Sequence, residues 1–195
     1  MKPLSRYIVC GRVTKRPIFD FVSTRIRPND ALMVFPFEDD YSFGILQSAV
    51  HWAWFVARCS TLKGDFRYTS NTVFDTFAWP QKPTKAHVRA VADAAVALRK
   101  LRQEQRAMHA LSLRELYRAT EKPGKHPLAQ AHARLDEVVR AVYGIGPTQD
   151  VLGFLAELNR KCAEKEARGE SVVGPGLPSV VSDQASFVTQ DCISP

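Results

Sequence analysis

The stretch from residue 41 to residue 80 constrains the fold of this chain more than any other. It contains an apolar, aromatic run, Phe43–Cys59, whose composition predicts a helix, although its aromatic residues leave a strand open. A short polar loop follows, and a second aromatic run, Phe74–Trp79, ends at Pro80. Bulky apolar residues beside a loop of donors and acceptors are typical of a surface that recognises a specific partner.

Short strands are predicted before this stretch and helices after it. β-branched and aromatic residues recur over Tyr7–Val13, Ile18–Val22 and Leu32–Phe37, and turn-forming residues separate the three runs. We therefore expect an α+β fold, in which a short-strand N-terminal domain with one helix is followed by a small helical bundle and an irregular C-terminal tail. The predicted boundaries are residues 1–82, 83–168 and 169–195.

The expected bundle helices have recognisable start signals. Thr84, Ser112 and Thr148 can each cap a helix, and Pro127 suits the first turn of another. Short connections between these helices are typical of a bundle. The tail after residue 168 is expected to be irregular, and disorder at its end is left open. The residues expected to face inward are Val88, Val91, Ala92, Ala95, Leu98, Leu128, Ala131, Leu135, Val138, Val139, Val142, Val151, Leu152, Leu155 and Leu158.

Positive charge is concentrated near the start of the chain. The net charge is +7, which permits a nucleic-acid partner without requiring one. The first 27 residues contain seven basic side chains and a single acid, Asp20. Such an excess suits contacts with phosphates, which need Lys or Arg but no particular sequence; simple solvation is the alternative. The candidates for such contacts are Arg12, Lys15, Arg16, Arg25 and Arg27.

No complete catalytic constellation is found in the sequence. The four cysteines are far apart and form no C-x-x-C pair, and the five histidines are scattered, so we expect no metal site. Neither a P-loop lysine motif nor a G-x-S-x-G elbow occurs, and the Gly144–Gly146 pair follows a predicted helix. The apolar run 49–57 is too short to cross a bilayer. We expect a reduced, cytoplasmic protein without membrane partner, bound cofactor or activity of its own.

Ser48 and His51 would share one face of the predicted helix because they are three residues apart. One interpretation is a hydrogen-bonding pair that faces DNA or another domain. The alternative is a histidine whose hydrogen bonds are satisfied at the edge of the core. The aromatic side chains nearby are more typical of core than of base-stacking residues: Phe43, Trp52, Trp54, Phe77 and Trp79.

Several ordered motifs resemble one known family. YSFGILQS at residues 41–48, followed by His51 and Trp54, is similar to a pattern, fGiLsS-x-x-H-x-x-W, of the target-recognition domain of MmeI-like type IIL restriction–modification enzymes. Arg67-Tyr68-Thr69 resembles the family's R-Y-S, and DTFAWP at residues 75–80 resembles its N-T-F-P-W-P. Leu116-Tyr117, PLAQAHARLD at 127–136 and Tyr143-Gly144 resemble its C-terminal helical domain. The resemblance covers about Tyr7 to Pro178, and the sequence departs from it at Thr69, Asp75 and Ala78.

The resemblance implies a parent enzyme that joins a nuclease, which uses Mg²⁺, to an adenine-specific methyltransferase and a recognition domain. The methyltransferase would use S-adenosylmethionine to methylate N6 of an adenine flipped out of the duplex. Its N-P-P-Y-type motif and the acidic cluster of the nuclease have no counterpart here. We therefore expect residues 1–82 to form a partial DNA target-recognition domain, with residues 83–168 as the helical domain.

The resemblance also places a base-reading pair in the polar loop. Two residues that lie two apart, just ahead of the R-Y-S segment, help to select one base pair in the family, and here they align with Lys63 and Asp65. Lysine can donate to guanine O6 and N7, and aspartate can accept from cytosine N4. A solvated turn is the alternative. Arg67 can reach either a phosphate or a base.

Three hypotheses for the function remain. The first is a double-stranded DNA recognition module that has no catalytic domain. The second is a specificity or interaction subunit that acts in trans with a separate methyltransferase chain. The third is a truncated remnant without present function, which would expose apolar surface around residues 43–55.

Overall fold

The N-terminal part forms two small antiparallel sheets. The computed structural model describes residues 3–62, 64–121 and 126–195. In the first sheet, β1 (Arg6–Gly11) lies between β3 (Asp20–Ser23) and β4 (Leu32–Phe35). The alternation along β1 sends Ile8 and Cys10 into the main core and Tyr7 and Val9 to the other face. The three predicted strands are therefore present, with shorter bounds.

The second sheet corrects one expectation, because the predicted polar loop is a β-hairpin. β5 (Ser60–Leu62) and β6 (Asp65–Arg67) pair antiparallel, and β2 (Val13–Thr14) pairs with the other edge of β6. Gly64 lies in the turn with φ of +88°, a conformation that residues with a Cβ rarely adopt. These strands have only two or three residues each, which is too short for an alternating pattern to be recognised in the sequence.

The single predicted helix at Phe43–Cys59 is two helices, α1 (Asp40–Gln47) and α2 (Ala49–Arg58). Ser48 breaks the helix because its backbone is extended and its hydroxyl oxygen accepts from the amide of His51, which caps α2. Gly44 lets α1 approach α3 closely, since a Cβ there would lie 2.6 Å from Cγ1 of Val91. The expectation of one helix in this part was wrong because Ser48 ends α1 and caps α2.

The helical part follows a π-helical turn, Ser70–Phe74 (η1). Its helices are α3 (Lys85–His109), α4 (Leu113–Thr120), α5 (Pro127–Tyr143) and α6 (Val151–Ala167). Thr84 and Ser112 cap α3 and α4 as predicted, and Pro127 occupies the first turn of α5.

Two expectations about α6 were wrong. Asp150 caps this helix in place of Thr148, because its carboxylate accepts from the amides of Leu152 and Gly153. Leu152 was expected to face inward but is exposed, whereas Leu155 is buried. The remaining inward-facing residues of α3 and α5 are buried or half-buried as predicted.

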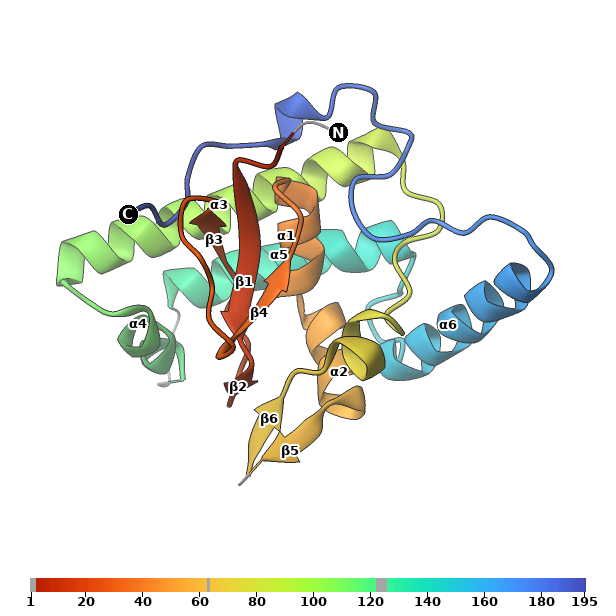
Figure 1. Ribbon diagram of the computed structural model, residues 1–195, viewed down its shortest axis with the longest axis horizontal. Coiled ribbons are helices and arrows are strands. Elements are labelled where there is room, and N and C mark those ends of the chain that lie inside the picture. The colour runs from red at the N-terminus through yellow and green to blue at the C-terminus, as the bar shows by residue number, and fades with distance from the viewer. Residues whose placement is uncertain (1–2, 63, 122–125) are drawn as a thin grey trace.

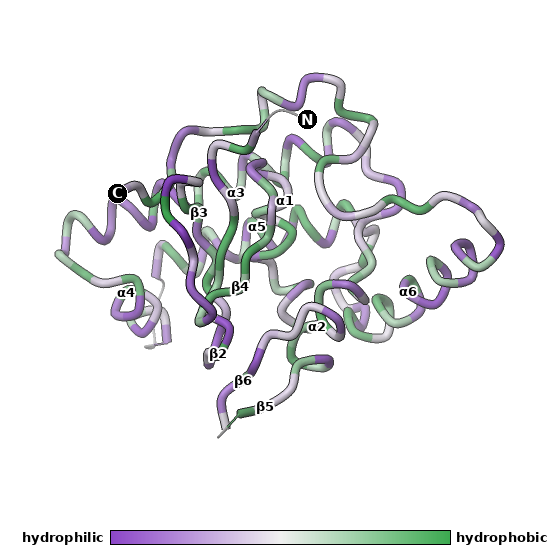
Figure 2. The backbone as a smooth tube through the Cα atoms, in the orientation of Figure 1, coloured by the Kyte–Doolittle hydropathy of each residue, from purple (hydrophilic) through white to green (hydrophobic). Residues whose placement is uncertain are grey.

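One hydrophobic cluster joins the first sheet to α1, α2, α3 and α5. The long helix α3 crosses behind the sheet and packs on both α1 and α5 (Figure 1). The coloured tube in Figure 2 is apolar along the sheet and the inner helices, whereas purple, polar stretches gather around β2 and β6. The hairpin β5–β6 projects from this body, next to β2 (Figure 1).

The tail is largely irregular, as predicted, but its end is held in place. After α6 the chain contains one short 3₁₀ turn, Ala185–Phe187 (η2), and returns over α3 to the sheet (Figure 1). There Ile193 forms a parallel bridge with Val22. The amide of Ile193 donates to the carbonyl of Phe21 at 2.8 Å, and the Ile193 carbonyl accepts from Ser23 at 2.9 Å. The end of the chain is therefore ordered against β3, and the expectation of disorder there was wrong.

Candidate nucleic-acid interface

The hairpin β5–β6 has one face against the protein and one face toward solvent. Phe66 packs edge-on against Trp52, with ring centroids 5.6 Å apart, and against Phe55 at 5.8 Å. Because side chains alternate along a strand, the neighbours of Phe66, Asp65 and Arg67, project from the opposite face. The hairpin therefore offers one acceptor and one donor on its outward face.

The strand register identifies the other members of that face. Leu62 lies opposite Asp65, and Arg67 lies opposite both Ser60 on β5 and Val13 on β2. Asp65 is half-buried, and the other four side chains are exposed. We call these residues the hairpin face: Val13, Ser60, Leu62, Asp65 and Arg67.

Lys63, the other half of the predicted base-reading pair, lies outside the described residues. Asp65 is placed on the hairpin face, as the prediction requires. No described side chain forms a salt bridge with Asp65 or Arg67. The base-reading role of the pair stays a prediction.

The structure divides the basic residues predicted to contact phosphates into two groups. Arg12, Lys15 and Arg16 flank β2, next to the hairpin; Lys15 and Arg16 are exposed, and Arg12 is half-buried. Arg25 and Arg27 are exposed too, but they follow β3 at the end of the first sheet where Arg6 pairs with Ser23. The length of β1, roughly 17 Å, separates the two ends of that sheet.

Ser48 and His51 do not face solvent, so their interpretation as DNA contacts was wrong. His51 is completely buried, and its Nε2 lies 2.9 Å from the hydroxyl of Tyr68. Burial lowers the pKa of His51 to about 4, with partial compensation from the Leu46 backbone, so the imidazole is neutral at pH 7. The Ser48 hydroxyl donates to the carbonyl of Ile45 at 2.8 Å. Both residues fix the junction of α1 and α2.

Tyr68 anchors the base of the hairpin, a role that the sequence did not reveal. Its ring stacks on Phe55 with centroids 5.2 Å apart, and its amide donates to the carbonyl of Arg12 at 2.8 Å. The hydrogen bond with His51 adds a third connection. Through these contacts Tyr68, directly after Arg67, ties β6 to both α2 and the strand region that contains β2. The R-Y-S-like motif therefore joins an exposed arginine to a buried anchor.

The aromatic residues around the hairpin belong to the core, as predicted. Phe43, Trp54, Phe77 and Trp79 are buried. Trp52 is half-buried beneath the hairpin, where it contacts Phe66. Since none of these rings is open to solvent on the hairpin face, the candidate interface depends on polar and aliphatic side chains, and base stacking has no support.

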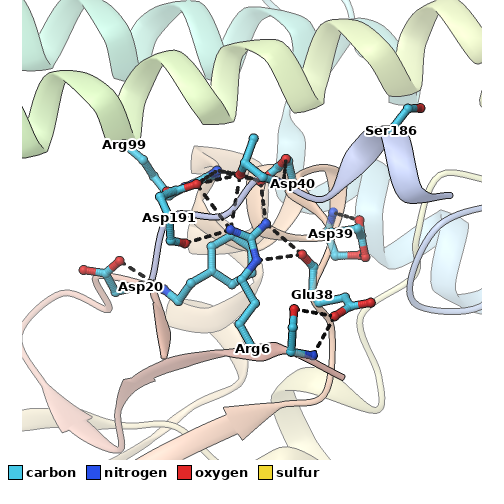
Figure 3. A network of polar contacts seen from close by, with 12 residues as sticks. Arg6, Asp20, Glu38, Asp39, Asp40, Arg99, Ser186 and Asp191 are labelled. Atoms are coloured by element: carbon cyan, nitrogen blue, oxygen red, sulfur yellow. Dashed lines mark hydrogen bonds and ion pairs between the residues drawn. The ribbon is translucent and has the colours of Figure 1, made fainter. Parts of the chain in front are cut away.

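A second set of charges is buried except for Asp191, which is half-buried, and we call it the buried clasp: Arg6, Asp40, Arg99 and Asp191. Oδ1 of Asp40 lies 2.9 Å from Nη2 of Arg6 and 2.5 Å from Nη2 of Arg99. Asp191, from the tail, lies 2.7 Å from Nε of Arg99 (Figure 3). Burial opposes ionisation of Asp191, but its ion pair with Arg99 outweighs burial and lowers its pKa to about 2. Arg6 was counted in the basic N-terminal excess, yet it contributes no surface charge.

Neither a metal site nor a membrane-spanning helix is found in the described ranges. Over residues 3–62, 64–121 and 126–195, no three His, Cys, Asp or Glu side chains gather to hold a metal ion. The helices in the same ranges include none that is long and apolar enough to span a membrane. The hairpin face and the adjoining basic residues are thus the strongest candidate for function.

Comparisons with known proteins agree with this location. Residues 16–81 match the family model of the MmeI target recognition domain, so the match includes α1, α2 and the hairpin. DNA methyltransferase A of Bacillus subtilis (strain 168) is 33% identical over 103 residues, which are 53% of this chain. A solved structure of the type IIL restriction–modification enzyme MmeI in complex with DNA superposes on 84% of this chain with a TM-score of 0.73 and 26% identity.

This chain covers only a small part of both relatives. It spans 11% of the length of the Bacillus methyltransferase and 22% of the MmeI chain. The matches therefore concern one portion of much longer proteins, and that portion contains an MmeI-like target recognition domain.

Proposed function

We propose that this chain, which contains an MmeI-like target recognition domain, recognises a specific sequence of double-stranded DNA for a restriction–modification enzyme. The observation that carries the proposal is the hairpin face. It is exposed, it is anchored to the core through Tyr68, and it lies within the residues that match the recognition-domain family. The MmeI structure with similar fold contains DNA, which supports a duplex as the partner.

The chemistry of the hairpin face suits the major groove of B-DNA. That groove admits a two-stranded β-ribbon, and its base edges present hydrogen-bond donors and acceptors. Asp65 can accept from cytosine N4, and Lys63 can donate to O6 and N7 of guanine. The pair would therefore favour a G·C base pair whose guanine lies on the DNA strand that the lysine contacts. Arg67 can reach a base or a phosphate. Lys15 and Arg16, beside β2, would contact phosphates without reading the sequence.

In this proposal the chain has no catalytic activity of its own. The reaction of the parent enzyme would be adenine-N6 methylation, with S-adenosylmethionine as the source of the methyl group, and a nuclease would need Mg²⁺. We assign neither group to residues of this chain. Its part would be to hold the duplex in register, so that a methyltransferase domain or chain acts at one place.

Selection from a randomised duplex pool, at low and at moderate salt, tests the proposal. We expect enrichment of a short motif by the purified chain. The double variant Lys63→Ala/Asp65→Ala should lose the preference for one G·C pair, a change of about 1–3 kcal/mol per contact. A matched control is Arg134→Ala/Glu137→Ala, which removes an exposed ion pair from α5 and should leave the motif unchanged.

The possible outcomes separate three hypotheses. Uniform weakening on all sequences would show that Lys63 and Asp65 do not read a base. Salt-sensitive binding without any enrichment would reduce the proposal to a basic surface. If a folded chain binds only after a methyltransferase chain is added, the specificity-subunit hypothesis replaces the stand-alone reader. A chain that does not fold would favour the truncated remnant.

A further inference from the structure

Leu62 is one of two apolar side chains on the hairpin face, and unlike Val13 on β2 it lies in the hairpin itself. It is 46% exposed, and the register places it directly opposite Asp65. It does not pack the hairpin onto the protein, because Phe66 does so from the opposite face through Trp52 and Phe55. The fold therefore gives no reason for a leucine at this position.

The spacing of the hairpin links Leu62 to the base edge that Asp65 would read. Residues opposite each other in an antiparallel pair have Cβ atoms about 5 Å apart. Successive base pairs are stacked about 3.4 Å apart along the duplex. A ribbon that brings Asp65 to a cytosine N4 thus brings Leu62 to the same base pair or to its neighbour.

The chemistry of leucine then limits what it can recognise. Its side chain has no donor or acceptor, so it cannot read the hydrogen-bond pattern of any base. The apolar group that DNA presents in the major groove is the C5-methyl group of thymine. Contact with that methyl group would also remove the exposed surface of Leu62 from water.

We propose that Leu62 is a specificity residue that contacts the C5-methyl group of a thymine next to the base pair read by Asp65. This inference rests on the proposed function, because it requires the hairpin face to enter the major groove. It adds an A·T preference at one position to the G·C preference assigned to Lys63 and Asp65. An isolated surface leucine, which is common in proteins, would make no such contact.

Replacement of thymine by uracil tests the inference, since uracil lacks only the methyl group. The probe is the duplex enriched from the randomised pool, with each thymine changed in turn. We expect one substitution to weaken binding of the unaltered chain about fourfold, the loss expected for one buried methyl group. Leu62→Ser should bind the thymine and uracil duplexes equally. Val180→Ser, which alters another exposed aliphatic residue at 45% exposure in the tail, should retain the fourfold difference.

Thermal unfolding of each variant confirms that the fold is unchanged, as expected for an exposed position. If the chain enriches a motif but no thymine shows a methyl effect, or if Leu62→Ser keeps that effect, the inference is overturned and the proposed function stands. If no motif is enriched either by the chain alone or after a methyltransferase chain is added, both are overturned together. A methyl effect that disappears only in Leu62→Ser supports the contact.

Discussion

The buried clasp and the hairpin face use the same residue types in opposite ways. In the clasp, Asp40 is 2% exposed and pairs with two arginines from distant segments. On the hairpin face, Asp65 and Arg67 have no salt-bridge partner among the described side chains. One set of charges is paired inside the fold, and the other forms no salt bridge among the described side chains.

The comparison shows that the number of charges does not locate a binding surface. A buried ion that loses its partner is strongly destabilised, whereas an exposed one is solvated by water. Changes in the clasp should therefore alter stability, and changes on the hairpin face should alter recognition.

The largest effect is expected for Asp40→Ala. This change leaves the guanidinium groups of Arg6 and Arg99 with only Asp191 as a carboxylate partner. Removal of one partner from a buried ionic group costs about 3–5 kcal/mol. We expect the free energy of unfolding, measured by urea denaturation, to fall by that amount. The matched change Asp65→Ala should cost less than about 0.5 kcal/mol, and equal losses for the two variants would erase the distinction.

Acidification should weaken the interior without any mutation. Burial lowers the pKa of His51 to about 4, and burial followed by repulsion from Arg102 and Arg16 lowers the pKa of His132 to about 3. Both imidazoles stay neutral in the fold while the unfolded chain binds protons below pH 6.5, so stability is lost as pH falls below that value. Asp39 opposes this, because burial raises its pKa to about 6 and the fold gains stability as the pH falls through that range.

Burial also raises the pKa of Asp20 and Asp136, so these two carboxyl groups act in the same direction as Asp39. Because the pKa values of both histidines are strongly lowered, we still expect a net loss in the free energy of unfolding between pH 7 and pH 4.5. Urea denaturation at the two pH values measures it, and an NMR titration should find neither imidazole protonated above pH 5. Titration of His51 near pH 6.5 would mean that it is open to water. The same result for His132 would mean that its hydrogen bond with Tyr117, like that of His51 with Tyr68, is not buried in the core.

The division between interior and surface also explains what the sequence could predict. Apolar periodicity located the strands and the buried stripes of α3 and α5, because burial of those faces sets the spacing of their residues. The break at Ser48 was missed because a mid-run serine reads equally well as a helical residue and as a cap. The hairpin was missed because strands of three residues are too short to establish an alternating pattern.

The candidate site was predictable only through its family motifs. Those motifs pointed to the segment 63–67, and the structure places Asp65 and Arg67 on one exposed face. Helical spacing left Ser48 and His51 open to two interpretations, a pair facing DNA or another domain and a satisfied histidine at the edge of the core, and the structure buries both residues. Asp40 and Asp191 belong to one cluster although they are 151 residues apart in the sequence. No local sequence pattern reveals such a contact, because it depends on the tertiary fold.

A smaller effect on stability is expected for Gly44→Ala, which tests packing beneath the interface. The added Cβ would lie 2.6 Å from Cγ1 of Val91 and 3.3 Å from Cβ of Ala95, so α1 must move away from α3. Overpacking of this kind costs about 1–3 kcal/mol. Urea denaturation measures the loss, and Gly174→Ala, where a Cβ meets no atom within 4 Å, is the control. A Gly44→Ala variant as stable as the unaltered chain would show that the two helices are not in close contact.

The smallest expected effect divides the exposed basic residues themselves. Lys15 lies beside β2 and the hairpin, whereas Arg25 lies at the other end of the first sheet. If the hairpin face enters the duplex, Lys15→Gln should reduce the slope of log affinity against log salt by about one unit, since one phosphate contact releases about one counterion. Arg25→Gln removes the same charge and should leave the slope unchanged. Equal changes for both would mean that both residues contact phosphates, so that DNA covers a wider basic surface than the hairpin face defines.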